Sequence, residues 1–102
     1  MNFPIRNPRT SAVEGEFAAS TSDEISATFF KLQRAQREWE SVGVVARAHG
    51  LQTFLDTLND VVWREKLLAA LMADTGRKNE SLTELNGLTS TLQRWISYAF
   101  EN

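Results

Sequence analysis

Apolar residues between positions 44 and 76 recur at the spacing of an α-helix. A first group shares one helix face by its three- and four-residue intervals: Leu51, Phe54, Leu55, Leu58, Val61 and Val62. A second stripe consists of Leu67, Leu68, Leu71 and Met72. Glu65 falls where the first stripe would continue, so the two stripes are not in phase. The rest of the chain is expected to pack against this long helical stretch.

The slip between the two stripes predicts a bend in the chain. Asn59 and Asp60, which are both good N-cap residues, lie beside it. We predict two helices, over Val44–Leu58 and Asp60–Ala73, with one kinked helix as the alternative. Gly76 is expected to end this stretch, because glycine takes the left-handed conformation after a helix at little cost.

The residues before position 20 predict a short hairpin or an extended arm. Pro4 and Pro8 lack backbone donors and bias the residues before them away from helix. Asn7–Thr10 is a turn candidate, which suggests pairing of Phe3–Arg6 with Ala12–Phe17. A two-stranded hairpin alone is marginal in water, so this one needs support from the helices or from another body.

Two more helices are predicted, one before and one after the central stretch. Thr21 and Glu24 have the spacing of a capping box, with Ser22 as a rival cap, and this helix closes at Ser41–Gly43. Its apolar stripe, which Phe30 widens, consists of Ile25, Phe29, Leu32 and Trp39.

The last helix is predicted to begin at a second capping box, formed by Ser81 and Glu84. Gly87 costs this helix about 1 kcal/mol relative to alanine. Its apolar residues follow at helical spacing: Leu82, Leu85, Leu88, Leu92, Trp95, Ile96 and Ala99.

These elements predict a mainly α fold in one domain, residues 1–102. A short N-terminal β-hairpin or extended arm (1–20) is followed by about four amphipathic helices (21–102) that form a bundle. Strands and helices do not alternate as a parallel sheet requires.

Composition narrows the function classes. Hydrophobic residues make up 42% of the 102 residues, charged residues 24%, and the net charge is −2, which is ordinary globular composition. This balance gives no electrostatic footprint for nucleic acid. No apolar run reaches the length that spans a bilayer, and no signal-peptide core follows Met1–Pro4. Without cysteine as well, we expect a cytoplasmic protein with neither nucleic-acid nor membrane partners.

No residue pattern in the chain predicts catalysis. The absence of cysteine excludes a thiol nucleophile, and His49, the only histidine, is interpreted as a helix-surface residue rather than a metal ligand. No G-x-G-x-x-G pattern is present, so neither a metal nor a cofactor is expected on this chain. We interpret Trp39, Trp63 and Trp95 as packing anchors rather than stacking platforms for bases.

The order of several short motifs resembles the N-terminal segment of the NAD(P)-dependent aldehyde dehydrogenases. The resemblance runs from about Ile5 to Ala99. Asn7–Thr10 looks like that family's N-P-x-T turn, and Ala73–Arg77 is similar to its E-T-G-K turn. The remaining matches lie on the helices: Ser22–Ile25, Gln36–Trp39, Ala46–Ala48, the Leu51/Leu55/Leu58 stripe, Ala69–Leu71 and Leu92–Trp95. Two departures are Ser11-Ala12 in place of Gly-Glu and the lack of a proline after Arg77.

The resemblance implies a parent enzyme that oxidises an aldehyde to a carboxylic acid with NAD or NADP. In that family a cysteine attacks the aldehyde and a glutamate activates water, and both residues lie downstream of the matched region. The implied role is therefore a non-catalytic part of an oligomeric enzyme, namely the N-terminal part of its cofactor-binding domain, which wraps the outside of that domain. The alternative is a free-standing helical module that binds a partner protein.

Two surface predictions complete the sequence reading. Aromatic residues too numerous for four short helices to hide are expected to form an apolar patch that drives self-association or packing on the rest of the enzyme: Phe29, Phe30, Trp63, Tyr98 and Phe100. On the last helix, small and polar residues share one face: Thr83, Gly87, Ser90, Thr91 and Arg94. That face is either solvated or, as the resemblance implies for Thr83 and Gly87, part of the wall of an aldehyde tunnel.

Overall fold

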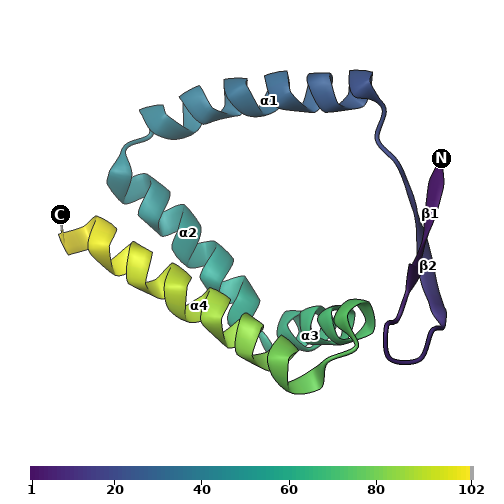
Figure 1. Ribbon diagram of the computed structural model, residues 1–102. Helices are drawn as coiled ribbons and strands as arrows, with labels where there is room; N and C mark the ends of the chain where they lie inside the picture. Colours follow the sequence, from purple (N-terminus) through teal and green to yellow (C-terminus); the bar gives the residue numbers. More distant parts are fainter. Residues whose placement is uncertain (102) are drawn as a thin grey trace.

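The computed structural model describes residues 1–101 as a hairpin followed by four helices (Figure 1). This confirms the predicted mainly α fold class with an N-terminal hairpin. The elements are β1 (Asn2–Arg6), β2 (Val13–Ala18), α1 (Ser22–Ser41), α2 (Val44–Asn59), α3 (Val61–Thr75) and α4 (Lys78–Glu101).

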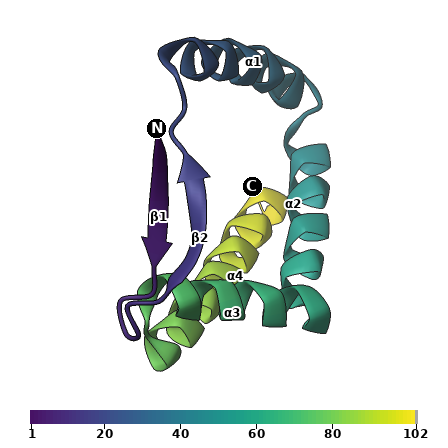
Figure 2. The same cartoon turned by 90° about the vertical axis from the view of Figure 1, so that its right-hand side faces the viewer.

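The two strands form an antiparallel hairpin, seen side by side in Figure 2. Phe3 lies opposite Phe17, and the register shifts between Ile5 and Arg6. In the turn, the Asn7 side chain accepts a hydrogen bond from the Arg9 amide at 2.9 Å, a local bond that asparagine commonly makes in turns. The predicted hairpin is therefore confirmed, in preference to an unpaired arm.

The start of α1 follows the sequence signal closely. The Thr21 hydroxyl accepts from the Glu24 amide at 3.2 Å, and the Glu24 carboxylate accepts from the Thr21 amide at 2.7 Å. This reciprocal pair satisfies two of the amides that a helix N-terminus leaves without partners. Thr21, rather than Ser22, is the cap.

The central stretch consists of two helices, so the alternative of one kinked helix is wrong. Asp60 has extended dihedrals (φ −61°, ψ 132°), and its carboxylate accepts from the amides of Val62 and Trp63. It therefore interrupts the helix and caps the next one. Gly76 ends α3 in the left-handed conformation, with φ 68°, as predicted.

The second predicted capping box is wrong. Helix α4 already begins at Lys78, which places Ser81 inside it. Ser81 is 1% exposed. Its hydroxyl donates to the carbonyl of Arg77 and lies 3.1 Å from the hydroxyl of Thr75. A serine within a helix commonly bonds back to the carbonyl four residues earlier, and the same Ser-x-x-Glu spacing fits both situations. Ser81 thus joins the end of α3 to the start of α4.

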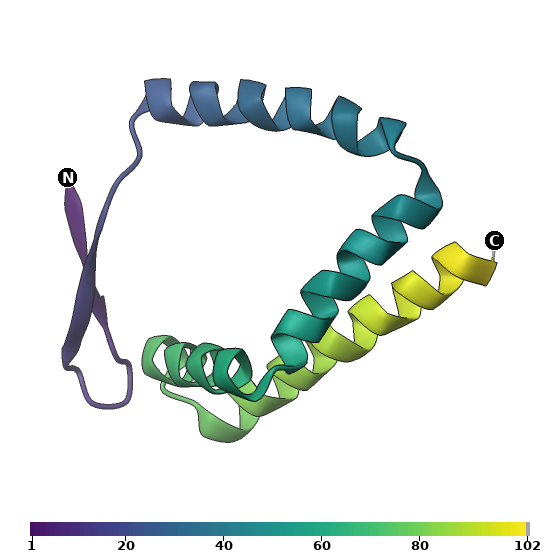
Figure 3. The same ribbon diagram turned by 180° about the vertical axis from the view of Figure 1, so that it is seen from behind.

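The core lies between α2 and α4, which run side by side (Figure 3). Its buried apolar residues are Ala48, Leu55, Leu58, Leu85 and Ile96. Helix α3 also packs against α4, and there the Arg64 side chain donates a hydrogen bond to the side chain of Asn86 on α4. The central stretch is therefore the packing partner of α4, as predicted.

The predicted bundle is wrong for α1, which stands apart from the core between α2 and α4 (Figure 1). The hairpin, predicted as an arm outside the bundle, also lies away from that core. Within residues 22–41 no side chain is buried. The radius of gyration is 17.5 Å, against roughly 13 Å for a compact domain of this length. Gly43, at φ 87°, directs α2 away from the end of α1 instead of back along it. The helical spacing of α1 predicted an apolar face but not this chain direction.

Candidate functional site

The predicted substrate face of α4 is open to solvent. Thr83 and Gly87 are both exposed, and the Thr83 hydroxyl donates to the carbonyl of Asn79 at 3.0 Å. A Cβ added at Gly87 would meet nothing within 4 Å. The buried residues of α4 are others, Ser81, Leu85 and Ile96. The fold brings Thr83 and Gly87 onto one helix face, and their part in a substrate tunnel stays a prediction.

The predicted exposure of large apolar residues is confirmed. Five aromatic side chains are between 48% and 62% exposed: Phe29, Phe30, Trp63, Tyr98 and Phe100. The strands add Phe3 and Phe17, which are 48% and 66% exposed. The five predicted residues lie on three different helices, α1, α3 and α4, so their gathering into one patch stays a prediction.

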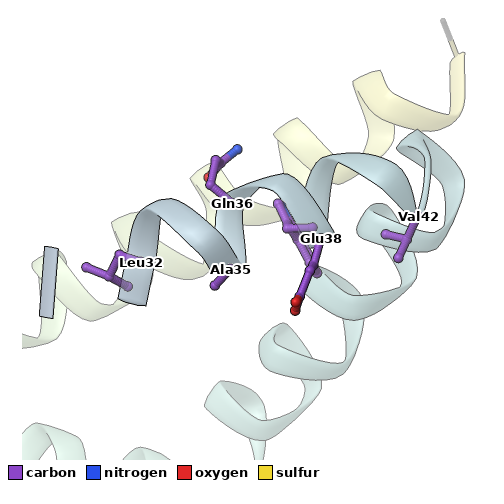
Figure 4. Close-up of a pocket in the computed structure, with 6 residues that line it drawn as sticks. Leu32, Ala35, Gln36, Glu38 and Val42 are labelled. Carbon is purple, nitrogen blue, oxygen red and sulfur yellow. The ribbon is translucent and has the colours of Figure 1, made fainter. Parts of the chain in front are cut away.

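One of the exposed apolar surfaces follows α1. An open groove of about 700 Å³ is lined by Leu32, Ala35, Gln36, Glu38, Trp39 and Val42, all from α1 and the residue after it (Figure 4). A second groove, of about 320 Å³, continues toward the start of the helix past Ile25, Thr28 and Phe29, and shares Leu32 with the first. The two grooves form one apolar stripe along the helix, and every groove residue named here belongs to α1 or its cap.

A separate apolar groove, of about 420 Å³, is lined by residues of α2 and α3. Its lining residues include Phe54, Trp63 and Leu67, and the ammonium group of Lys66 lies 5.1 Å from the centre of the Trp63 ring. Sequence reasoning missed this cation–π contact, although Trp63 and Lys66 have the three-residue spacing that brings helix side chains together. The contact places a positive charge beside an apolar surface.

The tryptophans pack less than predicted. The Trp39 indole lies against Gly50 of α2, where an added Cβ would be 3.1 Å from the ring, yet Trp39 is still 41% exposed. Trp63 and Trp95 are 56% and 63% exposed, so their interpretation as packing anchors is wrong. Trp95 instead lies edge-on to Tyr98 of the same helix, at 5.9 Å between ring centres.

His49 is an exposed helix residue, as predicted, and its ring lies edge-on to Phe100 at 5.2 Å between ring centres. Among residues 1–101, no three His, Cys, Asp or Glu side chains lie where they could hold a metal ion. None of the helices in that part of the chain is long and apolar enough to cross a membrane.

Comparison of this chain with protein-family models, with curated proteins and with solved structures yields no match. The resemblance to aldehyde dehydrogenases therefore stays a prediction from the chain's own motifs.

Proposed function

We propose that this chain is the N-terminal, non-catalytic portion of an NAD(P)-dependent aldehyde dehydrogenase. The order of the motifs carries the proposal. Two of them fall at the corners of the fold: Asn7–Thr10 lies in the hairpin turn, and Gly76 and Arg77 connect the end of α3 to α4. These corners also meet, because Arg9 and Pro8 lie against Gly76. The contact gives a reason for both turn motifs to occur in one chain.

The exposed surface supports a role that needs a covering body. A compact protein of 11.5 kDa exposes about 5,800 Å². This chain exposes 8166 Å², an excess of roughly 2,400 Å² over that scaling. The excess is what a segment wrapped around a larger domain would bury. In this proposal the apolar faces of α1 and the hairpin pack on the cofactor-binding domain of the same enzyme.

The proposal assigns NAD or NADP, the nucleophilic cysteine and the glutamate to the remainder of the enzyme, and it includes a cytoplasmic location. The coding sequence tests it directly. We expect the reading frame to continue beyond this chain into a domain with a dinucleotide-binding sheet and a cysteine nucleophile. A stop codon, or an unrelated downstream domain, would overturn the proposal.

The purified chain is expected to produce no NADH when mixed with NAD and short aldehydes, because it lacks cysteine and a dinucleotide-binding pattern. The measurement is the absorbance of NADH over time, with a complete aldehyde dehydrogenase as the positive control. Steady turnover by the chain alone would contradict the non-catalytic role.

In a complete enzyme that carries this segment, Gly87→Leu is expected to narrow the aldehyde tunnel. KM should rise at least about tenfold for bulky aldehydes and change little for acetaldehyde, because a single methylene in a substrate pocket already changes discrimination by about 1–3 kcal/mol and leucine is larger than that. Folding should be preserved, since a side chain at Gly87 meets no atom within 4 Å in this structure. Equal changes in KM for large and small aldehydes would assign the face to solvent.

A protein-interaction module is the second candidate, and the uncovered stripe of α1 favours it. An amphipathic helix whose apolar face is free commonly docks into a groove or pairs with another helix. Such a module would act without the downstream enzyme, so the same reading-frame observation separates the two functions.

A further inference from the structure

We propose that α1 pairs with α1 of a second copy of this chain, in an antiparallel two-helix arrangement. The pairing concerns the chain by itself and does not rest on its assignment to an aldehyde dehydrogenase. The surface involved is the α1 seam, which we define as Ile25, Thr28, Leu32, Ala35, Trp39 and Val42.

The α1 seam has the spacing of a coiled coil. Its residues follow one another at alternating intervals of three and four, so Ile25, Leu32 and Trp39 occupy one heptad position and Thr28, Ala35 and Val42 the other. The four large apolar members are between 41% and 63% exposed: Ile25, Leu32, Trp39 and Val42. The helix is 20 residues long, about 30 Å, which gives the seam almost three heptads.

The sizes of the seam residues favour an antiparallel partner. In an antiparallel pair, the heptad position of Ile25, Leu32 and Trp39 on one copy faces the heptad position of Thr28, Ala35 and Val42 on the other. The two-fold axis makes every contact reciprocal. Leu32 then faces Ala35 of the second copy, Trp39 faces Thr28, and Ile25 faces Val42. Large side chains thus meet smaller ones in every layer, which lets the layers fill evenly. A parallel pair would instead set two tryptophans against each other and leave a gap at two alanines.

The charged residues beside the α1 seam also favour the antiparallel orientation. Lys31 and Glu38 flank one side of the α1 seam, and in the antiparallel pair Lys31 of each copy lies beside Glu38 of the other. In a parallel pair Lys31 would face Gln36 and gain no opposite charge. The two reciprocal ion pairs therefore select the orientation more than they add to affinity.

A second copy would cover part of the excess exposed surface. That excess, roughly 2,400 Å², is about three times what one partner contributes to an interface of standard size, so a dimer accounts for about a third of it. Helix α1 can be reached by another molecule, because it stands away from α3 and α4 and is held to α2 by the Trp39 indole on Gly50 (Figure 3). Thr28 of the second copy, being small, leaves room for an indole that already covers Gly50.

The first experiment is sedimentation of the complete chain over a range of micromolar concentrations. We expect a reversible dimer, with twice the 11.5 kDa of one chain. A monomer at the highest concentration would overturn the proposal, as would continued growth into larger species.

A matched pair of substitutions then tests the surface. Leu32 and Phe30 are 63% and 62% exposed and lie on different sides of the same helix, so neither change to glutamate buries a charge in the fold. We expect Leu32→Glu to weaken the dimer at least about 100-fold, because both copies lose a buried leucine. Phe30→Glu, outside the seam, should change the Kd by less than about threefold. Equal effects of the two variants would overturn the α1 seam as the interface.

A charge exchange tests the antiparallel register. Lys31→Glu and Glu38→Lys each turn two attractions into two repulsions and should raise the dimer Kd about tenfold. The double variant should return it to within about threefold of the original. Failure of this rescue would overturn the antiparallel register. Because the readout is dimer mass, its result is independent of the reading-frame test of the proposed function.

Discussion

Leu85→Ala is expected to lower the free energy of unfolding by about 2–5 kcal/mol, the usual range for removing a buried leucine side chain. Leu85 is 1% exposed and lies on α4, the helix that α2 and α3 pack against. The described core has only five buried apolar residues, and a domain is typically stable by about 5–15 kcal/mol. A single cavity there should therefore remove a large share of the total stability.

The measurement is urea unfolding followed by circular dichroism, at one fixed chain concentration so that any self-association is held constant. Leu88→Ala is the matched control: the same substitution, three residues along the same helix, at a side chain that is 44% exposed. It should cost less than about 1 kcal/mol. Equal losses from Leu85 and Leu88 would mean that α2 and α4 do not pack as described.

Local signals in the sequence predicted most of the elements, because their causes are local. The reciprocal bonds of Thr21 and Glu24, the cap at Asp60 and the left-handed Gly76 each depend on a few neighbouring residues. The hairpin likewise follows from Pro4 and the turn that starts at Asn7. Such bonds form within one turn of the chain, so their residue types point to them without knowledge of the fold.

The packing was harder to predict, because periodicity identifies an apolar face without identifying what covers it. The stripe of α1 has the same spacing as that of α4, yet Leu32 is 63% exposed and Leu85 is 1% exposed. The difference arises from the direction of the chain at Gly43, which depends on one pair of backbone dihedrals. Ser81 shows the same limit, since its spacing to Glu84 fits a cap and a helix interior equally well.

For the candidate site, the sequence predicted five exposed aromatic residues, but neither the other exposed apolar residues, such as Leu32 and Trp95, nor how they are arranged. Phe29 and Phe30 are both exposed as expected, while the division of α1 into a seam and an opposite side emerged from the two grooves that share Leu32. The Lys66 contact with Trp63 depends on rotamers that residue spacing permits without requiring. The tunnel role of Thr83 and Gly87 came from the family resemblance, and it stays a prediction until a complete enzyme is tested.

Gly76→Ala is expected to destabilise the chain by roughly 2 kcal/mol, through two separate effects. Gly76 has φ 68°, where a side chain is strained. An added Cβ would also lie 3.0 Å from the Arg9 amide nitrogen and 3.0 Å from the Pro8 ring, so the hairpin turn would have to move away from the connection between α3 and α4. The substitution therefore tests whether the two turn motifs meet in solution.

Gly87→Ala is the matched control, and its effect should have the opposite sign. Gly87 lies within α4, and a Cβ there meets nothing within 4 Å, so alanine should stabilise the helix by about 0.5–1 kcal/mol. Urea unfolding gives both free energies, and amide hydrogen exchange of β1 and β2 reports whether the hairpin has come loose. If Gly76→Ala lowers the free energy of unfolding but leaves amide hydrogen exchange in the hairpin unchanged, backbone strain at position 76 alone would explain the lower stability. Faster exchange in both strands of Gly76→Ala, and in neither strand of Gly87→Ala, is the result that the contact between Arg9 and Gly76 requires.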